Sequence, residues 1–129
     1  MIRVYIKKGA NYSIGSPKIK ESLKKIFTNH GIVSDSDVYV SFVGEKEMKD
    51  VARKYLKESN VIHNVLSFPE GEIRNKFIYP ESDILHLGEI ILCYPKLVEE
   101  AKNEGKLIDD KIIELVEHAA LHLLGIHHE

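Results

Sequence analysis

The sequence predicts an α+β fold, in which a small mixed β-sheet of about four strands packs with helices. Segments with strand patterns and segments with helical patterns follow one another in the order β-α-β-α-β-β-α-α. Residues 84–94 (ILHLGEIILCY) are apolar on both faces, which is typical of a central strand that is covered on both sides. Since compact domains contain roughly 100–150 residues, residues 1–129 are expected to form a single domain.

The other three predicted strands are short. Residues 2–6 alternate with period two, and residues 37–43 are mostly β-branched and aromatic. The strand at residues 65–68 ends at Pro69, because proline has no N–H to donate to a β-ladder. Residues 69–83 are rich in Pro, Glu, Gly and Asp and predict a loop that leads into the central strand.

Apolar residues at helical spacing predict four helices. Ser16 is expected to cap the first of them, with Pro17 at the first helical position. Asp109 or Asp110 is expected to cap the last helix, which runs into the C-terminal histidines. The other three helices are predicted over residues 17–30, 45–57 and 95–105.

Composition excludes several classes of protein. A single cysteine, Cys93, permits neither an intramolecular disulfide nor a cysteine-based zinc finger, and we expect it to be a small buried apolar residue. The net charge of −2 excludes a histone-like affinity for nucleic acid. The longest apolar run has five residues, far short of the ~20 that a membrane helix needs, and the first residues lack a signal-peptide core. We therefore expect a soluble, cytoplasmic protein without a membrane partner.

The histidines carry the clearest functional signal, since four of the seven lie in the last twelve residues. Two imidazoles four residues apart, His118 and His122, share one face of a helix. Gly125 can then adopt a left-handed conformation, end the helix and let the chain bring His128 to the same ion. Three neutral nitrogens leave a fourth tetrahedral position for water, as in catalytic zinc sites. The pattern predicts one Zn²⁺ bound by His118, His122 and His128, although three imidazoles also suit nickel, copper and iron.

Two alternatives remain open at this site. His127 could replace His128 as the third ligand, orient a ligand, or face solvent. The same histidine spacing occurs in metzincin proteases, whose general base is a glutamate directly after the first histidine. Here that position is Ala119, and Glu117 points about 100° around the helix from His118. A protease is therefore disfavoured.

Three blocks of sequence, at residues 63–69 (HNVLSFP), 87–92 (LGEIIL) and 118–128 (HAALHLLGIHH), occur in order along the chain. They resemble the blocks TDVLSFP, LGDIVI and HGxLHLxGYDH of the YbeY family of metal-dependent endoribonucleases and ribosomal-RNA maturation factors. The last block shares six of its nine specified positions with that signature. Ala119 and His127 replace a glycine and an aspartate of the family, and Asn64 replaces another aspartate. The chain is thus identified as a divergent member.

The resemblance implies a zinc-dependent endoribonuclease that acts in the maturation of small-subunit ribosomal RNA and in ribosome biogenesis. Its implied partners are RNA and the small ribosomal subunit. A water held by zinc on three histidines has its pKa lowered to about 7, and the hydroxide could attack a phosphodiester or free a ribose 2′-OH. The alternative from another class is a zinc-binding ribosome assembly factor that binds without cleaving.

The resemblance also concerns residues outside the histidines. The family carries an arginine after a tyrosine of its second helix, but here Tyr55 is followed by Leu56. Arg53, one turn earlier, is either a catalytic substitute or a solvated surface residue. Ser67 and Phe68 are expected either along the substrate groove or in an ordinary buried strand. Phosphate contacts are expected from a basic patch formed by Lys18, Lys20, Lys24, Lys25, Arg53, Lys54 and Lys57.

Overall fold

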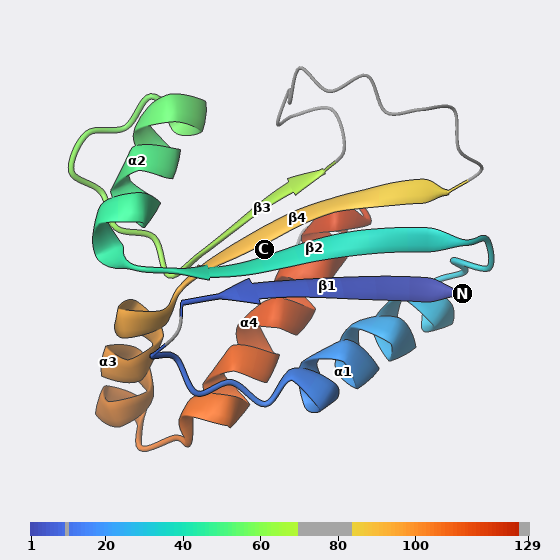
Figure 1. Cartoon of the computed structure of the whole chain (residues 1–129), viewed down its shortest axis with the longest axis horizontal. Helices are drawn as coiled ribbons and strands as arrows, with labels where there is room; N and C mark the ends of the chain where they lie inside the picture. Colours follow the sequence, from blue (N-terminus) through green and yellow to red (C-terminus); the bar gives the residue numbers. More distant parts are fainter. Residues whose placement is uncertain (10, 70–83, 127–129) are drawn as a thin grey trace.

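The computed structural model describes residues 1–9, 11–69 and 84–126 (Figure 1). Within these residues the secondary structure follows the order expected from the sequence, and the α+β class is confirmed. The elements are β1 (Ile2–Lys8), α1 (Ser16–Asn29), β2 (Ser36–Val43), α2 (Glu45–Leu56), β3 (Val65–Pro69), β4 (Leu85–Cys93), α3 (Tyr94–Glu104) and α4 (Ile108–Leu123). Their ends lie within about two residues of the predicted ones, the usual spread in assigning helix ends.

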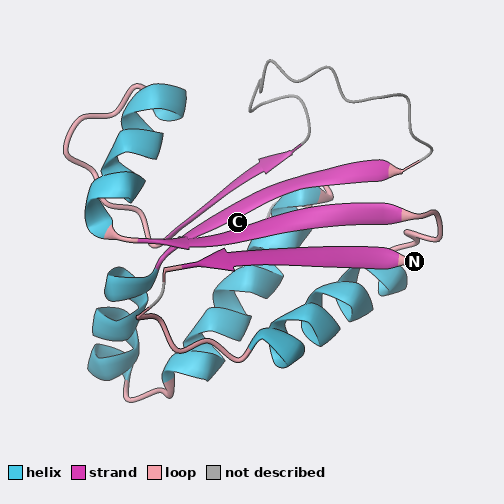
Figure 2. Cartoon of the chain, in the orientation of Figure 1, coloured by secondary structure: helices cyan, strands magenta, loops and turns pink. Residues whose placement is uncertain are grey.

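The four described strands form one mixed sheet in the order β1-β2-β4-β3 (Figure 2). β1 pairs with β2 and β2 with β4 in parallel, whereas β3 runs antiparallel to β4. Parallel neighbours need a crossover connection, which α1 supplies between β1 and β2. In this strand order β3 is an edge strand, and β4 lies inside the sheet, as predicted.

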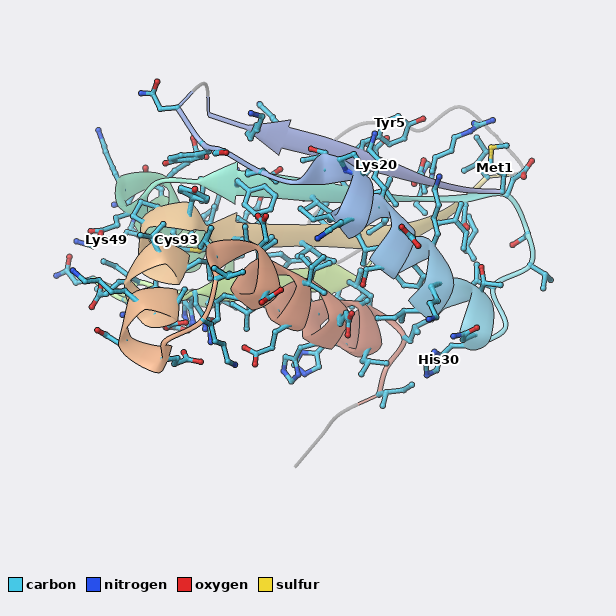
Figure 3. All side chains as sticks on the ribbon, turned by 90° about the horizontal axis from the view of Figure 1, so that it is seen from below. Met1, Tyr5, Lys20, His30, Lys49 and Cys93 are labelled. Atoms are coloured by element: carbon cyan, nitrogen blue, oxygen red, sulfur yellow. The ribbon has the colours of Figure 1, made fainter. Side chains whose placement is uncertain are left out.

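Helices cover the two faces of the sheet unequally. α1 and α4 pack on one face, which holds the larger apolar core, and α2 packs on the other (Figure 1). β4 contributes to both, since Ile90 and Leu92 point into the first core and Ile91 and Cys93 into the second. Figure 3 shows Tyr5 of β1 on the side of the sheet away from α1 and α4. Cys93 is fully buried, as predicted, and burial raises the pKa of its thiol.

The caps of two helices differ from the prediction. Ser16 is the first residue of α1, while Gly15 occupies the N-cap position without a side-chain hydrogen bond. The cap of α4 is Leu107, so neither Asp109 nor Asp110 caps this helix. Both aspartates lie in the first turn instead, where a carboxylate is favoured by the positive end of the helix dipole.

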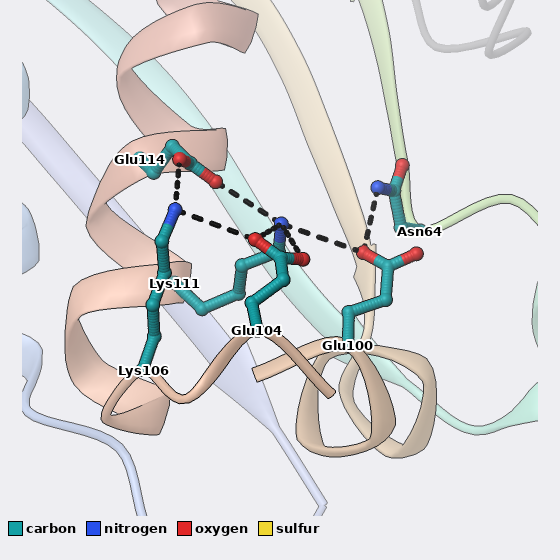
Figure 4. Close-up of polar contacts among 6 residues, drawn as sticks. All are labelled: Asn64, Glu100, Glu104, Lys106, Lys111 and Glu114. Atoms are coloured by element: carbon teal, nitrogen blue, oxygen red, sulfur yellow. Dashed lines mark hydrogen bonds and ion pairs between the residues drawn. The ribbon is translucent and has the colours of Figure 1, made fainter. Parts of the chain in front are cut away.

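A buried lysine joins α3 to α4. The side chain of Lys111 is 8% exposed, and its ammonium donates hydrogen bonds to Glu104 at 2.8 Å and to Glu114 at 3.1 Å (Figure 4). A third carboxylate, that of Glu100, lies 3.7 Å from the same nitrogen. Lys106 adds a 2.6 Å bond to Glu114. A buried cation is tolerated only when it is paired, and here three carboxylates surround it.

Acidification is expected to weaken the fold through these pairs. Hydrogen bonds from the lysines hold the pKa values of Glu104 and Glu114 below the ordinary 4.5. Both carboxylates therefore contribute stability above pH 4.5, and that contribution is lost as the pH falls from 4.5 through their lowered folded-state values. In a Lys111→Met variant, the drop in Tm on acidification should shrink but persist, because Lys106 still pairs with Glu114.

Thermal unfolding followed by circular dichroism between about pH 7 and about pH 3 checks this expectation. Lys102→Met is the matched control, since Lys102 is an exposed lysine of α3. A Lys111→Met variant whose Tm follows pH as steeply as that of the control would contradict the assigned role of the network.

Candidate active site

His118 and His122 lie on one face of α4, with ring centroids 4.3 Å apart. His118 is exposed and His122 is half-buried, so both rings remain accessible from outside the core. Between them, Ala119 and Ala120 are buried against the sheet and fix the helix in place. The structure therefore confirms the predicted placement of two neighbouring imidazoles on one helix face.

The turn after α4 has the predicted geometry. Gly125 adopts a φ of 79°, and its N–H donates to the carbonyl of His122 at 3.0 Å. The N–H of Ile126 donates to the carbonyl of Leu121 at 2.9 Å. These two bonds form a Schellman motif, which ends a helix and reverses the direction of the chain.

The third predicted ligand, His128, and its alternative His127 lie outside the described residues. Within residues 1–9, 11–69 and 84–126, no three His, Cys, Asp or Glu side chains converge to hold a metal ion. The part of the site that is described nevertheless fits zinc, because imidazole nitrogens on adjacent turns are ordinary zinc ligands. His128 therefore stays a prediction.

The two histidines open onto a cleft of about 420 Å³ between β3 and α4. Each of its two walls combines apolar and polar side chains: the imidazoles lie on the side of α4, and an amide and a hydroxyl lie on the side of β3. The residues that line it are Asn64, Val65, Leu66, Ser67, Leu115, His118, Ala119 and His122.

The two expectations for the 65–68 strand apply to different residues: Phe68 is buried as in an ordinary strand, whereas Ser67 faces a cleft, and its place along a substrate groove stays a prediction. Ser67 lines the cleft beside the histidines. Phe68, one position further along, points to the other face, where it is buried and its ring lies 5.5 Å from that of Tyr55. The period of two along a strand separates the two roles.

Asn64 is a cleft residue whose surroundings the sequence did not reveal. Its side-chain nitrogen donates to Glu100 of α3 at 3.0 Å, and its backbone carbonyl accepts from the N–H of Cys93 at 2.9 Å. In the sequence, this position stood out only because the family block has an aspartate where this chain has Asn64. No local pattern pairs it with a glutamate 36 residues later.

Gly88, in the sequence block at residues 87–92, allows β3 and α4 to pack closely against β4. Gly88 has a φ of 139°, a conformation that L side chains rarely adopt. A Cβ atom here would collide with the carbonyl oxygen of Phe68 and would lie 2.8 Å from the side chain of Leu123. Glycine thus lets β3 and α4 both approach β4 closely.

Glu89, the next residue, is not part of the cleft. It lies opposite Phe68 in the β3–β4 register, and side chains directly opposite each other project from the same face of a sheet. That face is the one packed by α2. Burial raises the pKa of the Glu89 carboxyl.

Arg53 does not line the cleft. Its side chain is 70% exposed and donates to Asp50 on the same helix at 2.9 Å. Since α2 packs on the face of the sheet opposite α4, the helix itself keeps Arg53 away from the histidines. The structure agrees with the interpretation of Arg53 as a solvated surface residue.

The seven predicted basic residues do not form one patch. Four of them lie on α1 and three on or next to α2, and these helices pack on opposite faces of the sheet (Figure 1). Lys18 and Lys25 share a depression between α1 and α4 with carboxylates such as Glu117. Glu117 itself accepts a hydrogen bond from Ser22 at 2.9 Å and does not line the cleft, so among the described residues no glutamate replaces the missing protease base there.

None of the described helices is long and apolar enough to cross a membrane.

Comparison with known proteins links the sequence to one family. The family model described as "Endoribonuclease YbeY" matches residues 7–129. A protein of that name from Wigglesworthia glossinidia brevipalpis is 34% identical over 112 residues, which cover 86% of this chain and 67% of the relative. Another from Stutzerimonas stutzeri (strain A1501) is 35% identical over 94 residues, covering 73% of this chain and 55% of the relative.

A solved structure supports the same likeness. The solution structure of a Thermotoga maritima protein superimposes with a TM-score of 0.60 at 27% sequence identity. The match covers 100% of this chain and 75% of that one. The matched region therefore takes up only part of the length of these relatives.

Proposed function

The chain belongs to the YbeY family of endoribonucleases, and from this premise we propose that it is a zinc-dependent endoribonuclease that matures small-subunit ribosomal RNA. The observation that carries the proposal is the pair His118 and His122, which opens onto a cleft of about 420 Å³. A cytoplasmic location and an association with the small ribosomal subunit belong to the same proposal.

In this proposal the zinc ligands are His118, His122 and His128. The imidazoles bind as neutral nitrogen donors, so the site requires them to be deprotonated. When bound, the ion supplies Lewis acidity, which lowers the pKa of water and offsets negative charge on a phosphoryl group.

The other cleft residues have their own tasks. Asn64 and Ser67 offer polar atoms that can orient a sugar-phosphate backbone. The apolar side chains of Val65, Leu66 and Leu115 exclude water from the wall of the cleft, which strengthens electrostatic interactions there. The chain thus positions the substrate and keeps the reacting phosphodiester beside the histidines.

A second candidate function is a zinc-binding ribosome assembly factor without nuclease activity. The position of Arg53 favours it, because this arginine lies away from the cleft and no other described arginine lines it. Incubating the zinc-loaded protein with fragments of small-subunit ribosomal RNA separates the two functions. Cleavage of the RNA supports the nuclease, and tight binding without cleavage supports the assembly factor. In a separate assay, cleavage of a peptide substrate would support a protease instead.

RNA affinity is expected to fall steeply with salt concentration. Each phosphate neutralised by a lysine or arginine contributes about −0.7 to the slope of log K against log[salt] for a single strand. Because α1 packs beside α4, we expect the Lys18→Gln/Lys25→Gln double variant to make that slope shallower by about 1.4. The comparison is Lys54→Gln/Lys57→Gln on the opposite face.

Fluorescence anisotropy with a labelled single-stranded RNA measures both slopes. Binding that does not depend on salt would rule out phosphate contacts altogether. A larger change in the α2 variant than in the α1 variant would place the RNA on the other face of the sheet.

A further inference from the structure

We propose that Asn64 is a substrate-binding residue whose amide oxygen accepts a hydrogen bond from a ribose 2′-OH in the cleft. Glu100 and Lys111 act behind it as positioning residues. This inference rests on the proposed function and adds to it the group of the substrate that the cleft recognises. It also gives the site a means of distinguishing RNA from DNA, which differ at this hydroxyl.

The orientation of the Asn64 amide follows from its partner. A carboxylate can only accept hydrogen bonds, so the atom 3.0 Å from Glu100 Oε1 must be the amide nitrogen. The oxygen Oδ1 consequently faces away from Glu100 (Figure 4). Within the described part of the chain no donor is hydrogen-bonded to Oδ1, so this acceptor is available at the cleft.

The network behind Asn64 holds this orientation before any substrate arrives. The oxygen of Glu100 that accepts from Asn64 also lies 3.7 Å from the Lys111 ammonium, which is itself buried between α3 and α4. The backbone of Asn64 is fixed as well, by the hydrogen bond from Cys93 to its carbonyl. A prearranged acceptor loses little conformational entropy when it binds, which favours specific recognition.

The lining of the cleft favours the sugar over the base as the partner of Asn64. Sequence-specific recognition of single-stranded RNA stacks bases on Phe, Tyr, Trp, His or Arg side chains. In the described lining, the imidazoles are the only rings, and they are the proposed metal ligands. The remaining wall consists of small or aliphatic side chains and Ser67, which suit a ribose and its phosphate.

The test compares the affinities of zinc-loaded protein for four oligonucleotides of one sequence that differ only at the 2′ position. These carry a hydroxyl (RNA), an amino group, a fluorine, or hydrogen (DNA). Hydroxyl and amino groups can donate to Oδ1, whereas fluorine and hydrogen cannot. Wild-type protein should bind the two donors more tightly than the others by about 3- to 10-fold, the effect of one neutral hydrogen bond. Anisotropy gives the affinities at incubation times short enough that a gel shows each oligonucleotide still uncleaved.

Three variants locate the effect. Asn64→Ala should lose affinity only for the oligonucleotides that carry a 2′-hydroxyl or 2′-amino group. It should therefore bind all four with similar affinity. Glu100→Gln should retain part of the preference, because a glutamine amide holds Asn64 in either orientation. Glu99→Gln removes the same charge from an exposed position of α3 and should behave as wild type. Circular dichroism shows whether each variant is folded.

The outcomes separate the inference from the proposed function. An Asn64→Ala variant that keeps the preference for 2′ donors would overturn the inference and leave a nuclease intact. A Glu100→Gln variant identical to Glu99→Gln would show that Glu100 does not position Asn64. Wild-type protein that binds no RNA would overturn the proposed function, and the inference with it.

Discussion

A His122→Ala variant is expected to lose its zinc and its cleavage of ribosomal RNA together. His122 is half-buried and provides one of the two described imidazoles at the cleft. Among the described lining residues, no third imidazole could replace it. Loss of a group that holds a catalytic metal should lower activity by more than ~100-fold. Elemental analysis of protein purified without an affinity tag, together with cleavage of a ribosomal-RNA fragment, measures both effects.

The matched control is His30→Ala. His30 is an exposed histidine that follows α1, and among described residues its imidazole bonds only to the carbonyl of Ile26. Its removal should leave one metal per chain and full activity. The elemental analysis also identifies the metal, since nickel, copper or iron would suit the same ligands. One zinc per chain retained by His122→Ala would show that His122 is not needed to hold the ion.

A Gly88→Ala variant is expected to lose about 3 kcal/mol of folding free energy. The φ of 139° strains any L residue, and the added methyl group meets backbone that cannot move cheaply. Its neighbours would be the Phe68 carbonyl, Pro69 Cα at 3.1 Å and Leu123 Cδ2 at 2.8 Å. Relief requires β3 or the end of α4 to shift, and both carry walls of the cleft.

Chemical denaturation measures this loss, with Gly105→Ala as the comparison. Gly105 also has a positive φ, of 67°, but nothing lies within 4 Å of a Cβ added there. The Gly105→Ala variant should therefore lose only about 1 kcal/mol of folding free energy, from the backbone strain of a left-handed residue. Equal losses in the two variants would show that close approach of β3 and α4 to Gly88 is not what requires glycine.

Patterns that are local in the chain predicted the fold well. β4 was expected to be central because both of its faces are apolar, and its alternate residues indeed enter two separate cores. Helical spacing placed His118 and His122 on one face, and Gly125 at the turn that ends α4. Each of these features depends on the periodicity of a single element, which the sequence displays directly.

Features that depend on two distant elements could not be predicted in this way. Asn64 meets Glu100 only because β3 pairs antiparallel with β4, which leads directly into α3. Likewise, no periodicity indicates that α2 packs on the face opposite α4, which removes Arg53 from the cleft. Lys111 was an ordinary helix residue in the sequence, and only the packing of α3 against α4 buries it.

We propose that a metal ion at the histidine cleft makes this chain a ribonuclease. Cleavage of a small-subunit ribosomal-RNA fragment by the wild-type protein before chelation, after chelation, and after zinc is restored tests whether activity depends on that ion. We predict cleavage that is lost with the metal and returns with stoichiometric zinc. Cleavage that continues unchanged in the chelated protein would contradict the claim.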